Sequence, residues 1–155
     1  MKEIEGDLIK FSKRGDFDLI GHGCNCKKNW GAGIALQMKK YYYESFKVDL
    51  NSNPVMGEYS YCDYYDNVGI LNIYSQRYPG KPKDGYDSEF MRLQAIESAM
   101  KSINEKFKGD HIGLPLIGAG LAGLKWQKVK KIIKNELVDM DVTIVHYNPN
   151  IKIKK

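Results

Sequence analysis

Two glycine-rich segments of this 155-residue chain have the composition of anion-binding turns. They are residues 31–33 (Gly-Ala-Gly) and residues 118–123 (Gly-Ala-Gly-Leu-Ala-Gly). Each lies between a predicted strand and a predicted helix, where backbone N–H groups can approach a phosphate and the helix N-terminus adds partial positive charge. Ligands of open α/β sheets bind at the carboxyl ends of the strands, so two such turns facing one crevice could cradle a diphosphate.

Either segment alone could be no more than a tight turn. Neither is followed by the Gly-Lys-Ser/Thr pattern of a P-loop, and neither has Gly-x-Gly-x-x-Gly in the context of a dinucleotide-binding unit. The residues therefore favour phosphate binding without a nucleotide-hydrolase motif.

The cysteines and the hydropathy pattern exclude several other classes. Cys24, Cys26 and Cys62 are odd in number, so they cannot form a fully paired disulfide framework. The first two are separated by one residue, too close for the usual zinc-site pair, and no second pair completes a ligand set. The N-terminus lacks the apolar segment of a secretory signal, and no apolar run approaches the roughly 20 residues of a membrane span. We expect a cytoplasmic protein without a bound metal or cofactor and without a membrane partner.

The formal net charge of +5 favours anionic ligands in general, because a positive field raises their local concentration. The lysines are scattered along the chain, and no strip of aromatic and basic residues accompanies them. Nucleic-acid binding through charge alone is therefore not expected.

Strands and helices alternate between these segments. Alternating or continuous apolar patterns predict strands at residues 2–11 (broken at Gly6-Asp7), 18–23, 58–65, 68–75, 111–117 (interrupted at Pro115) and 142–145. Apolar residues at helical spacing predict helices from Gly33, after a cap at Asp87 or Ser88, and around residues 126–137. Residues 77–87 contain two prolines and two glycines and are predicted as a loop, whereas Asp66-Asn67 is predicted as a hairpin turn. This order predicts a three-layer α/β/α fold. We expect one domain over residues 1–155, with a short basic tail from about residue 149.

Three motifs together resemble the macro-domain family. The stretch Gly-His-Gly-Cys-Asn-Cys at 21–26, continued by Asn-Trp-Gly-Ala-Gly-Ile-Ala-Leu-Gln at 29–37, resembles its first ligand loop. It looks closest to the branch that includes ADP-ribose-1''-phosphate phosphatases. Residues 5–8 (Glu-Gly-Asp-Leu) are similar to the signature of the family's first strand, and residues 114–121 resemble its second phosphate loop. The resemblance extends from about residue 3 to about residue 147.

The resemblance implies a central mixed, mostly parallel sheet and a ligand that is ADP-ribose or a phosphorylated derivative. It places Asp7 and Leu8 at the adenine, with Asp7 accepting a hydrogen bond from the exocyclic amine. Asn25 would hydrogen-bond the hydroxyls of the distal ribose. Tyr147 is a candidate for the aromatic ring that covers the adenine, although a plain core or surface tyrosine fits its sequence position equally well.

The same resemblance divides the ligand's phosphates between the two glycine-rich segments. The first would offer N–H groups to one phosphate, and the second would hold the other phosphate and the distal ribose. The residues that it implies are Gly31, Ala32, Gly33 and Ile34 in the first segment, and Gly118, Ala119, Gly120 and Leu121 in the second.

For a phosphatase acting on the 1''-phosphate, His22 is the expected acid or base, because an imidazole titrates near neutral pH. A histidine that only hydrogen-bonds the ribose or the backbone is the alternative. A non-catalytic ADP-ribose reader would need the same loops, and ADP-ribosylated macromolecules are further candidate partners.

A related branch of the family removes ADP-ribosyl groups with a lysine and an aspartate. This chain has Ile-Tyr-Ser-Gln-Arg at 73–77 and Leu-Ala-Gly at 121–123 where those residues would fall, which argues against that mechanism. Arg77 could instead reach the distal ribose or its phosphate, since a guanidinium matches phosphate geometry.

Overall fold

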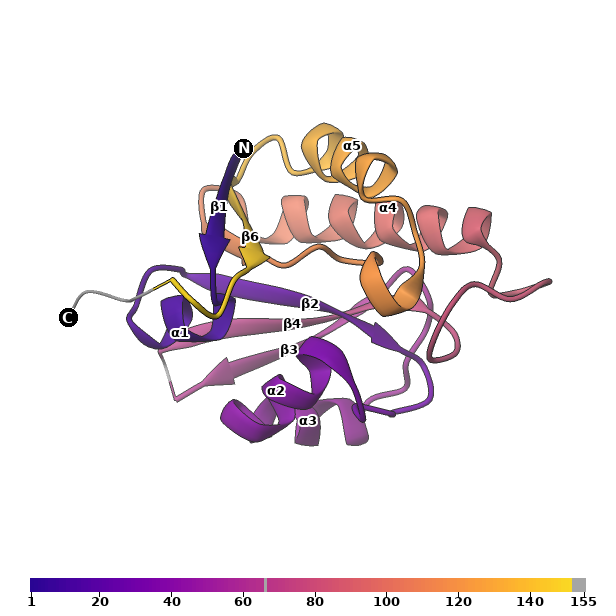
Figure 1. Ribbon diagram of the computed structural model, residues 1–155, viewed down its shortest axis with the longest axis horizontal. Coiled ribbons are helices and arrows are strands. Elements are labelled where there is room, and N and C mark those ends of the chain that lie inside the picture. Colours follow the sequence, from indigo (N-terminus) through magenta and orange to yellow (C-terminus); the bar gives the residue numbers. More distant parts are fainter. Residues whose placement is uncertain (66, 152–155) are drawn as a thin grey trace.

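Within residues 1–65 and 67–151, which the computed structural model describes, six strands form one sheet (Figure 1). The strands are β1 (Lys2–Gly6), β2 (Leu19–Asn25), β3 (Tyr59–Tyr64), β4 (Val68–Gln76), β5 (His111–Leu114) and β6 (Asp141–Tyr147). Their order is β1-β6-β5-β2-β4-β3, and all neighbours are parallel except β3 and β4. The predicted mixed, mostly parallel sheet is confirmed.

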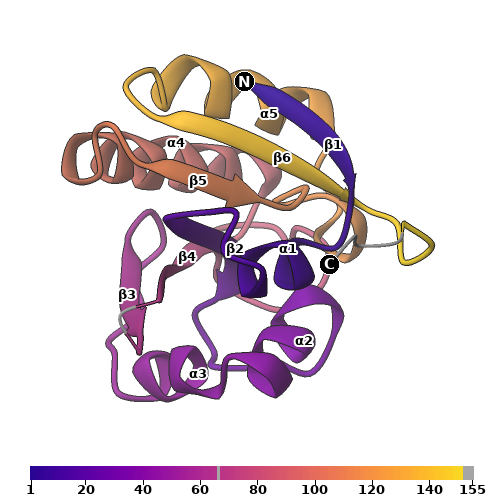
Figure 2. The ribbon, with the colours of Figure 1, turned by 90° about the vertical axis from the view of Figure 1, so that its left-hand side faces the viewer.

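Helices cover both faces of this sheet, so the three-layer prediction is also confirmed (Figure 2). They are α1 (Leu8–Lys13), α2 (Gly33–Tyr41), α3 (Tyr43–Leu50), α4 (Glu89–Lys106) and α5 (Trp126–Glu136), with a short 3₁₀ helix η1 (Gly120–Ala122). The first three helices pack on one face, and α4 and α5 pack on the other.

The sheet separates two hydrophobic clusters, and β4 shows why its sequence is a continuous apolar run. Leu71 and Ile73 face α4, whereas Ile70 and Tyr74 belong to the cluster under α2 and α3. Every residue of β4 is buried, as expected for a strand covered on both faces.

The prediction of a strand over residues 8–11 is wrong, because these residues form the first turn of α1. Asp7 is the N-cap of that helix, and its Oδ1 accepts a hydrogen bond from the Lys10 backbone N–H at 3.1 Å. Leu8, Ile9 and Phe11 are buried, but so short an apolar pattern fits a strand as well as a helix. The cap decides the outcome, since it satisfies a backbone donor of the helix.

Two other regions differ from expectation in detail. Helix α3 has no counterpart in the predicted elements; it follows α2 after Tyr42, whose φ of −135° and ψ of 58° separate the two helices. Tyr41, one of the residues at helical spacing in α2, is 46% exposed although Met38 on the same helix is fully buried.

The remaining boundaries follow the sequence signals, as far as the structure describes them. Strands β3 and β4 form the predicted hairpin, although Asp66 of its turn lies outside the described residues. Strand β5 ends at Leu114, directly before Pro115. Most of the expected basic tail, residues 152–155, also lies outside the described residues. No helix in the described part of the chain is long and apolar enough to cross a membrane.

Ser88 rather than Asp87 caps α4, and the contribution of this cap to stability can be tested. The Ser88 hydroxyl accepts a hydrogen bond from the Met91 backbone N–H at 3.2 Å. We expect Ser88→Ala to lower the free energy of unfolding by about 1 kcal/mol, because one donor of the first turn loses its acceptor. Urea denaturation measures the change.

The same substitution at Ser102, an exposed position inside α4, is the matched control. It should leave stability unchanged or raise it by a few tenths of a kcal/mol, because alanine is the better helix former. Equal losses at the two positions would contradict the capping role.

Candidate functional site

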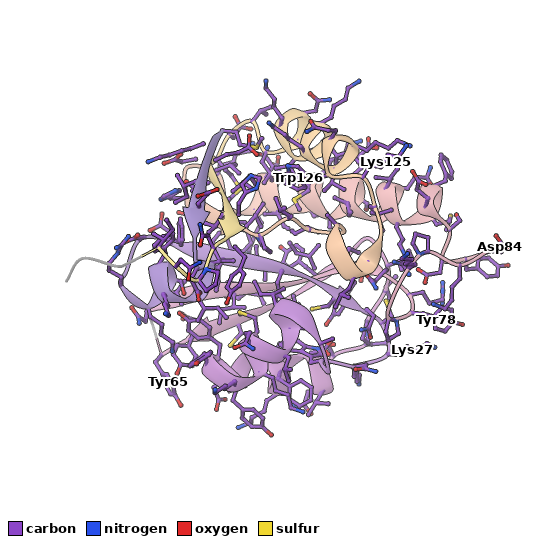
Figure 3. All side chains as sticks on the ribbon, in the orientation of Figure 1. Lys27, Tyr65, Tyr78, Asp84, Lys125 and Trp126 are labelled. Carbon is purple, nitrogen blue, oxygen red and sulfur yellow. The ribbon has the colours of Figure 1, made fainter. Side chains whose placement is uncertain are left out.

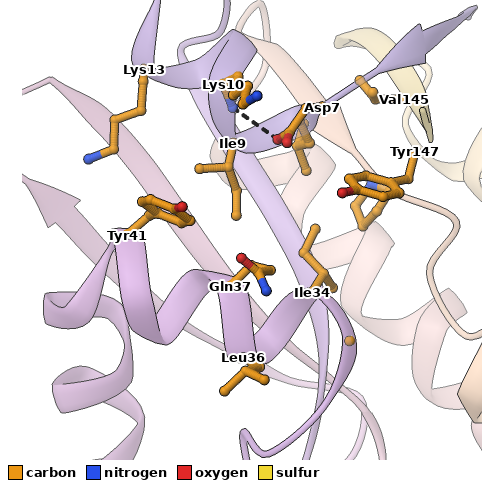
Figure 4. A pocket seen from close by; sticks show the side chains of 13 residues that line it. Asp7, Ile9, Lys10, Lys13, Ile34, Leu36, Gln37, Tyr41, Val145 and Tyr147 are labelled. Atoms are coloured by element: carbon orange, nitrogen blue, oxygen red, sulfur yellow. Dashed lines mark hydrogen bonds between the residues drawn. The ribbon is translucent and has the colours of Figure 1, made fainter. Parts of the chain in front are cut away.

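Two adjoining pockets lie at the carboxyl ends of the parallel strands. The wide pocket, of about 910 Å³, is lined by residues along α1 and α2 and by the end of β6 (Figure 4). The narrow pocket, of about 220 Å³, lies between the end of β2 and the turn that follows β5. Both pockets include Gly33, Ile34 and Pro115 in their walls, so an elongated ligand can extend from one into the other.

The first glycine-rich turn starts α2 without a side-chain cap. Ala32 occupies the N-cap position, and its methyl group cannot accept a hydrogen bond from the first turn. Gly33 follows with φ of +60°, a conformation that favours glycine. The first N–H groups of a helix lack partners within that helix, and here they face the shared wall of the pockets as donors for an anion.

The second glycine-rich turn lies opposite the first. A Cβ placed on Gly33 would be in van der Waals contact with Cδ1 of Leu121, at 3.7 Å, so the two turns adjoin each other. Gly118 and Gly120 have φ of +76° and +65°, which fold the chain back toward the start of η1. This arrangement fits a diphosphate held from both sides by backbone donors.

Not every residue expected at the phosphates has a free donor. The Gly31 N–H donates to Asn29 Oδ1 at 3.0 Å, and the Ala119 N–H donates to Leu116 O at 3.1 Å. Gly31 and Gly120 are also missing from the described residues that line either pocket. Ala32, Gly33, Ile34, Gly118, Ala119 and Leu121 do line the narrow pocket.

Asn25 lies at the expected place, but its side chain mainly shapes the loop behind the first turn. Its Oδ1 accepts from the backbone N–H groups of Lys27 (2.9 Å) and Asn29 (3.3 Å), and its Nδ2 donates to Asn29 O (2.8 Å). One N–H of the amide has no partner among the described residues. Asn25 can therefore donate one hydrogen bond to a ligand but has little acceptor capacity left.

Asp7 and Tyr147 both line the wide pocket (Figure 4). The cap to Lys10 uses Oδ1 of Asp7, which leaves Oδ2 available as an acceptor. Tyr147 is 73% exposed and lies beside Gly6 in the parallel pairing of β1 with β6. Leu8 and Ile34 contribute apolar wall, so this end can hold a flat heterocycle with one polar edge.

His22 does not reach either pocket, which corrects its expected role as the catalytic acid or base. Strand β2 continues to Asn25, so His22 lies inside the sheet with no exposed surface. Its Nε2 hydrogen-bonds Asn72 Oδ1 at 2.8 Å, and its ring meets the edge of Trp30 with centroids 4.7 Å apart. Burial lowers the pKa of His22 to about 4, despite the opposing effects of Asn72 and the charge of Asp49. The imidazole is neutral and shielded at pH 7.

A buried polar network that sequence reasoning missed explains this position. Asp49 is fully buried and accepts hydrogen bonds from Trp30 Nε1 (2.8 Å) and the Tyr74 hydroxyl (2.7 Å). Asn72 Oδ1 accepts a hydrogen bond from His22 Nε2, and Asn72 Nδ2 donates to Ser45 O. Trp30 is the residue in the sequence that could have indicated this network, since a buried indole N–H needs a hydrogen-bond acceptor. The network fixes Trp30 beneath the first glycine-rich turn.

Arg77 lies next to the narrow pocket but is not among the described residues that line it. Its guanidinium carbon is 5.6 Å from the Tyr86 ring centroid, and its buried Nε has no hydrogen-bond partner among the described residues. Its expected contact with a phosphate stays a prediction.

The site offers little ionisable chemistry. Of the described residues that line the narrow pocket, Cys24 alone can titrate, and burial raises the pKa of its thiol well above the usual value. Cys24, Cys26 and Cys62 are free thiols. The described residues include no group of three or more His, Cys, Asp or Glu side chains that could hold a metal ion.

Known proteins share both the sequence pattern and this fold, although no family model matches the sequence. The chain is 25% identical to the ADP-ribose 1''-phosphate phosphatase of Meyerozyma guilliermondii, over 92% of this chain and 97% of that protein. It is 28% identical to human ADP-ribose glycohydrolase OARD1, over 93% of this chain and 88% of that protein. The macrodomain of Mycobacterium tuberculosis DarG superposes with a TM-score of 0.71 at 25% identity, covering 97% of this chain and all of that one.

The chain has the macro-domain fold. The resemblance seen in the sequence is thereby confirmed for the fold, whereas the role of the two glycine-rich turns as ligand loops stays a prediction. His22, in contrast, is fully buried and is not among the described residues that line either pocket.

The burial of His22 has a measurable consequence for the pH dependence of stability. An unfolded histidine takes up a proton near pH 6.5, whereas the pKa of His22 in the folded protein is about 4. The stability due to neutral His22 is thus fully present above pH 6.5 and is lost as the pH falls through 4.

We expect the free energy of unfolding to fall by about 3 kcal/mol more between pH 7 and pH 4 in the wild type than in His22→Gln, which has no titrating group there. Urea denaturation at the two pH values measures both losses. If wild type and variant lost equal stability, His22 would be exposed to solvent and free to titrate.

Proposed function

We propose that this macro domain binds ADP-ribose and hydrolyses ADP-ribose 1''-phosphate to ADP-ribose and inorganic phosphate. The observation that carries the ligand class is that two uncapped glycine-rich turns adjoin each other where the two pockets share their walls. If the diphosphate binds at the turns, the nucleoside at one end of the ligand would lie in the wide pocket and the sugar at the other end in the narrow pocket. The relative of Meyerozyma guilliermondii, which matches nearly its full length, supports the reaction by its name.

The adenine belongs in the wide pocket. There Oδ2 of Asp7 can accept a hydrogen bond from the exocyclic amine while Oδ1 keeps its bond to Lys10. Tyr147 can cover one face of the base, and Leu8 and Ile34 supply apolar contact. Asn25 can then donate its remaining N–H to a hydroxyl of the distal ribose in the narrow pocket.

The hydrolysis must work without an exposed acid or base in the narrow pocket, as far as its described lining goes. The oxygen of a water molecule attacks phosphorus, the bond from phosphorus to the ester oxygen breaks, and that oxygen receives a proton from the water. Backbone donors of the two turns can orient the phosphoryl group and stabilise its developing charge. His22 acts only as a positioning residue, through Trp30 beneath the first turn.

A second candidate function is a reader that binds ADP-ribose, free or attached to a macromolecule, without turnover. The observation that favours it is the same shortage of titratable groups. Human OARD1 is named an ADP-ribose glycohydrolase, so removal of ADP-ribosyl groups is the alternative chemistry. The absence of a lysine over 73–77 and of an aspartate over 121–123 counts against the lysine-dependent route to it.

A cytoplasmic location is part of the proposal. The three free thiols suit a reducing compartment.

The turns can be tested with Gly33→Glu, which places a carboxylate where the proposed diphosphate lies. We expect ADP-ribose to bind at least about hundredfold more weakly, because like charges in a desolvated site cost several kcal/mol. Calorimetric titration measures binding, and phosphate release from ADP-ribose 1''-phosphate should disappear in parallel.

Gly109→Glu is the matched control, since Gly109 also has a positive φ (+86°) and has no neighbouring atoms within 4 Å of an added Cβ. It precedes β5, at the opposite end of that strand from the second turn. It should bind and react like the wild type. Wild-type binding without phosphate release would leave the reader, and no wild-type binding would refute the proposed ligand.

The role of Asp7 can be tested by changing the base. Inosine diphosphate ribose presents an oxygen in place of the exocyclic amine, so wild type should bind it about tenfold more weakly than ADP-ribose. In Asp7→Asn the amide can donate to that oxygen, and we expect the two affinities to differ by less than about threefold. Competition titration measures the ratio; an unchanged preference for adenine would show that Asp7 does not contact the base.

A further inference from the structure

Arg92, on α4, is a fully buried arginine whose guanidinium is surrounded by oxygen atoms. Its Nε and Nη2 donate to Oδ1 (3.0 Å) and Oδ2 (2.6 Å) of Asp87, a bidentate ion pair with no exposed side-chain surface. Neither residue was singled out in the sequence as part of the site.

The same guanidinium connects two loops that are far apart in the sequence. It donates to four backbone oxygens, those of Tyr78 (3.2 Å), Gly80 (2.7 Å), Lys81 (3.1 Å) and Ala122 (3.1 Å). Three of them belong to the loop at 77–87, which extends from the end of β4 and carries Tyr78 and Asp84 (Figure 3). The fourth belongs to the second glycine-rich turn.

Asp87 completes the attachment from the other side. Its Oδ1 accepts from the Arg77 backbone N–H at 2.8 Å, and its Oδ2 accepts from the Tyr78 N–H at 3.2 Å. Both ends of the loop at 77–87 are thus anchored to one ion pair. A buried ion pair gives little net stability compared with apolar packing, so what this one provides is a fixed geometry.

The loop positions that Arg92 fixes form part of the narrow pocket. Gly80 lines one wall of it and Ala122 lines another, and Nη1 of Arg92 binds the carbonyl oxygens of both. The distance between the two walls is therefore set by a single nitrogen. Because these carbonyl oxygens point at Arg92, their partial negative charges are directed away from an anionic ligand.

We propose that Arg92, oriented by Asp87, is a positioning residue that fixes the width of the narrow pocket and so determines the preference for ligands with a distal ribose. The inference rests on the proposed function, because it assigns the narrow pocket to that sugar. The adenosine half of the ligand, bound in the wide pocket, does not depend on Arg92.

The test compares ADP-ribose with ADP, which lacks the distal ribose. In Arg92→Met, calorimetric titration should show ADP-ribose binding weakened about tenfold or more, because small displacements of a positioning shell have large effects. ADP binding should change by less than about threefold. Met100→Ala, also fully buried on α4 but remote from the loops, controls for lost stability and should keep the wild-type ratio.

A second variant avoids the buried charge. Gly80 is exposed with φ of +83°, so Gly80→Ala strains the backbone that directs its carbonyl to Arg92 and leaves the core intact. We expect the same selective loss of ADP-ribose binding. Gly85→Ala is the matched control, because Gly85 lies in the same loop with φ of +77° but does not bind Arg92 or line the pocket.

The outcomes separate the two proposals. Wild-type ratios in both Arg92→Met and Gly80→Ala would overturn the role of Arg92 while leaving the proposed function intact. Equal weakening of ADP-ribose and ADP would also overturn it, since the effect would then be a general loss of structure. Failure of the wild type to bind ADP-ribose would instead refute the proposed function.

Discussion

A buried guanidinium must have its charge and its donors matched, and in this fold that requirement determines where two loops lie. Arg92 finds one carboxylate, Asp87, and four backbone oxygens. An unpaired charge in this position would cost several kcal/mol, so the loop after β4 and the turn after β5 cannot separate without a large penalty. Although the two segments are far apart in the sequence, the Arg92 side chain on α4 holds them together. The loop at 77–87 and the second glycine-rich turn, which have little regular secondary structure, are thereby fixed relative to each other.

Sheet topology supplies the other half. Strands β5, β2 and β4 are neighbours and parallel, so the segments that follow them emerge side by side at one edge. This places the two glycine-rich turns opposite each other and the Arg92-bound loop beside them. In each turn backbone donors rather than lysines approach the ligand path, although the chain has a formal charge of +5. Backbone donors are fixed in direction, whereas scattered surface lysines provide only a diffuse attraction.

The sequence was sufficient where the signal is local. Both glycine-rich turns, the cap of α4 to within one residue and the period of α4 can be found from residue order alone, and the sheet follows from the alternation of elements. It was insufficient where burial depends on distant segments. His22 lies in the predicted strand at 18–23, but its complete burial depends on α2 and α3, which cover β2. Arg92 resembles an ordinary charged residue of a helix, because nothing nearby in sequence shows that residues 78–81 fold over it. Leu8–Lys13 is ambiguous for another reason, since six residues are too few for periodicity to separate a helix from a strand.

Burial of His22 changes what kind of catalysis this site can perform. A neutral imidazole bonded to Asn72 and packed on Trp30 supports the first turn but exchanges no proton with a ligand. Cys24, the one titratable group in the described lining of the narrow pocket, is kept protonated by burial. In the proposed hydrolysis, rate enhancement must then come from holding the phosphoryl group and water in a fixed geometry and from donors aimed at developing charge. Such a mechanism depends on the rigidity of the surrounding walls more than on any one reactive side chain. The two buried polar systems of this protein, Asp49 with Trp30 and Asp87 with Arg92, supply that rigidity on opposite sides of the ligand path.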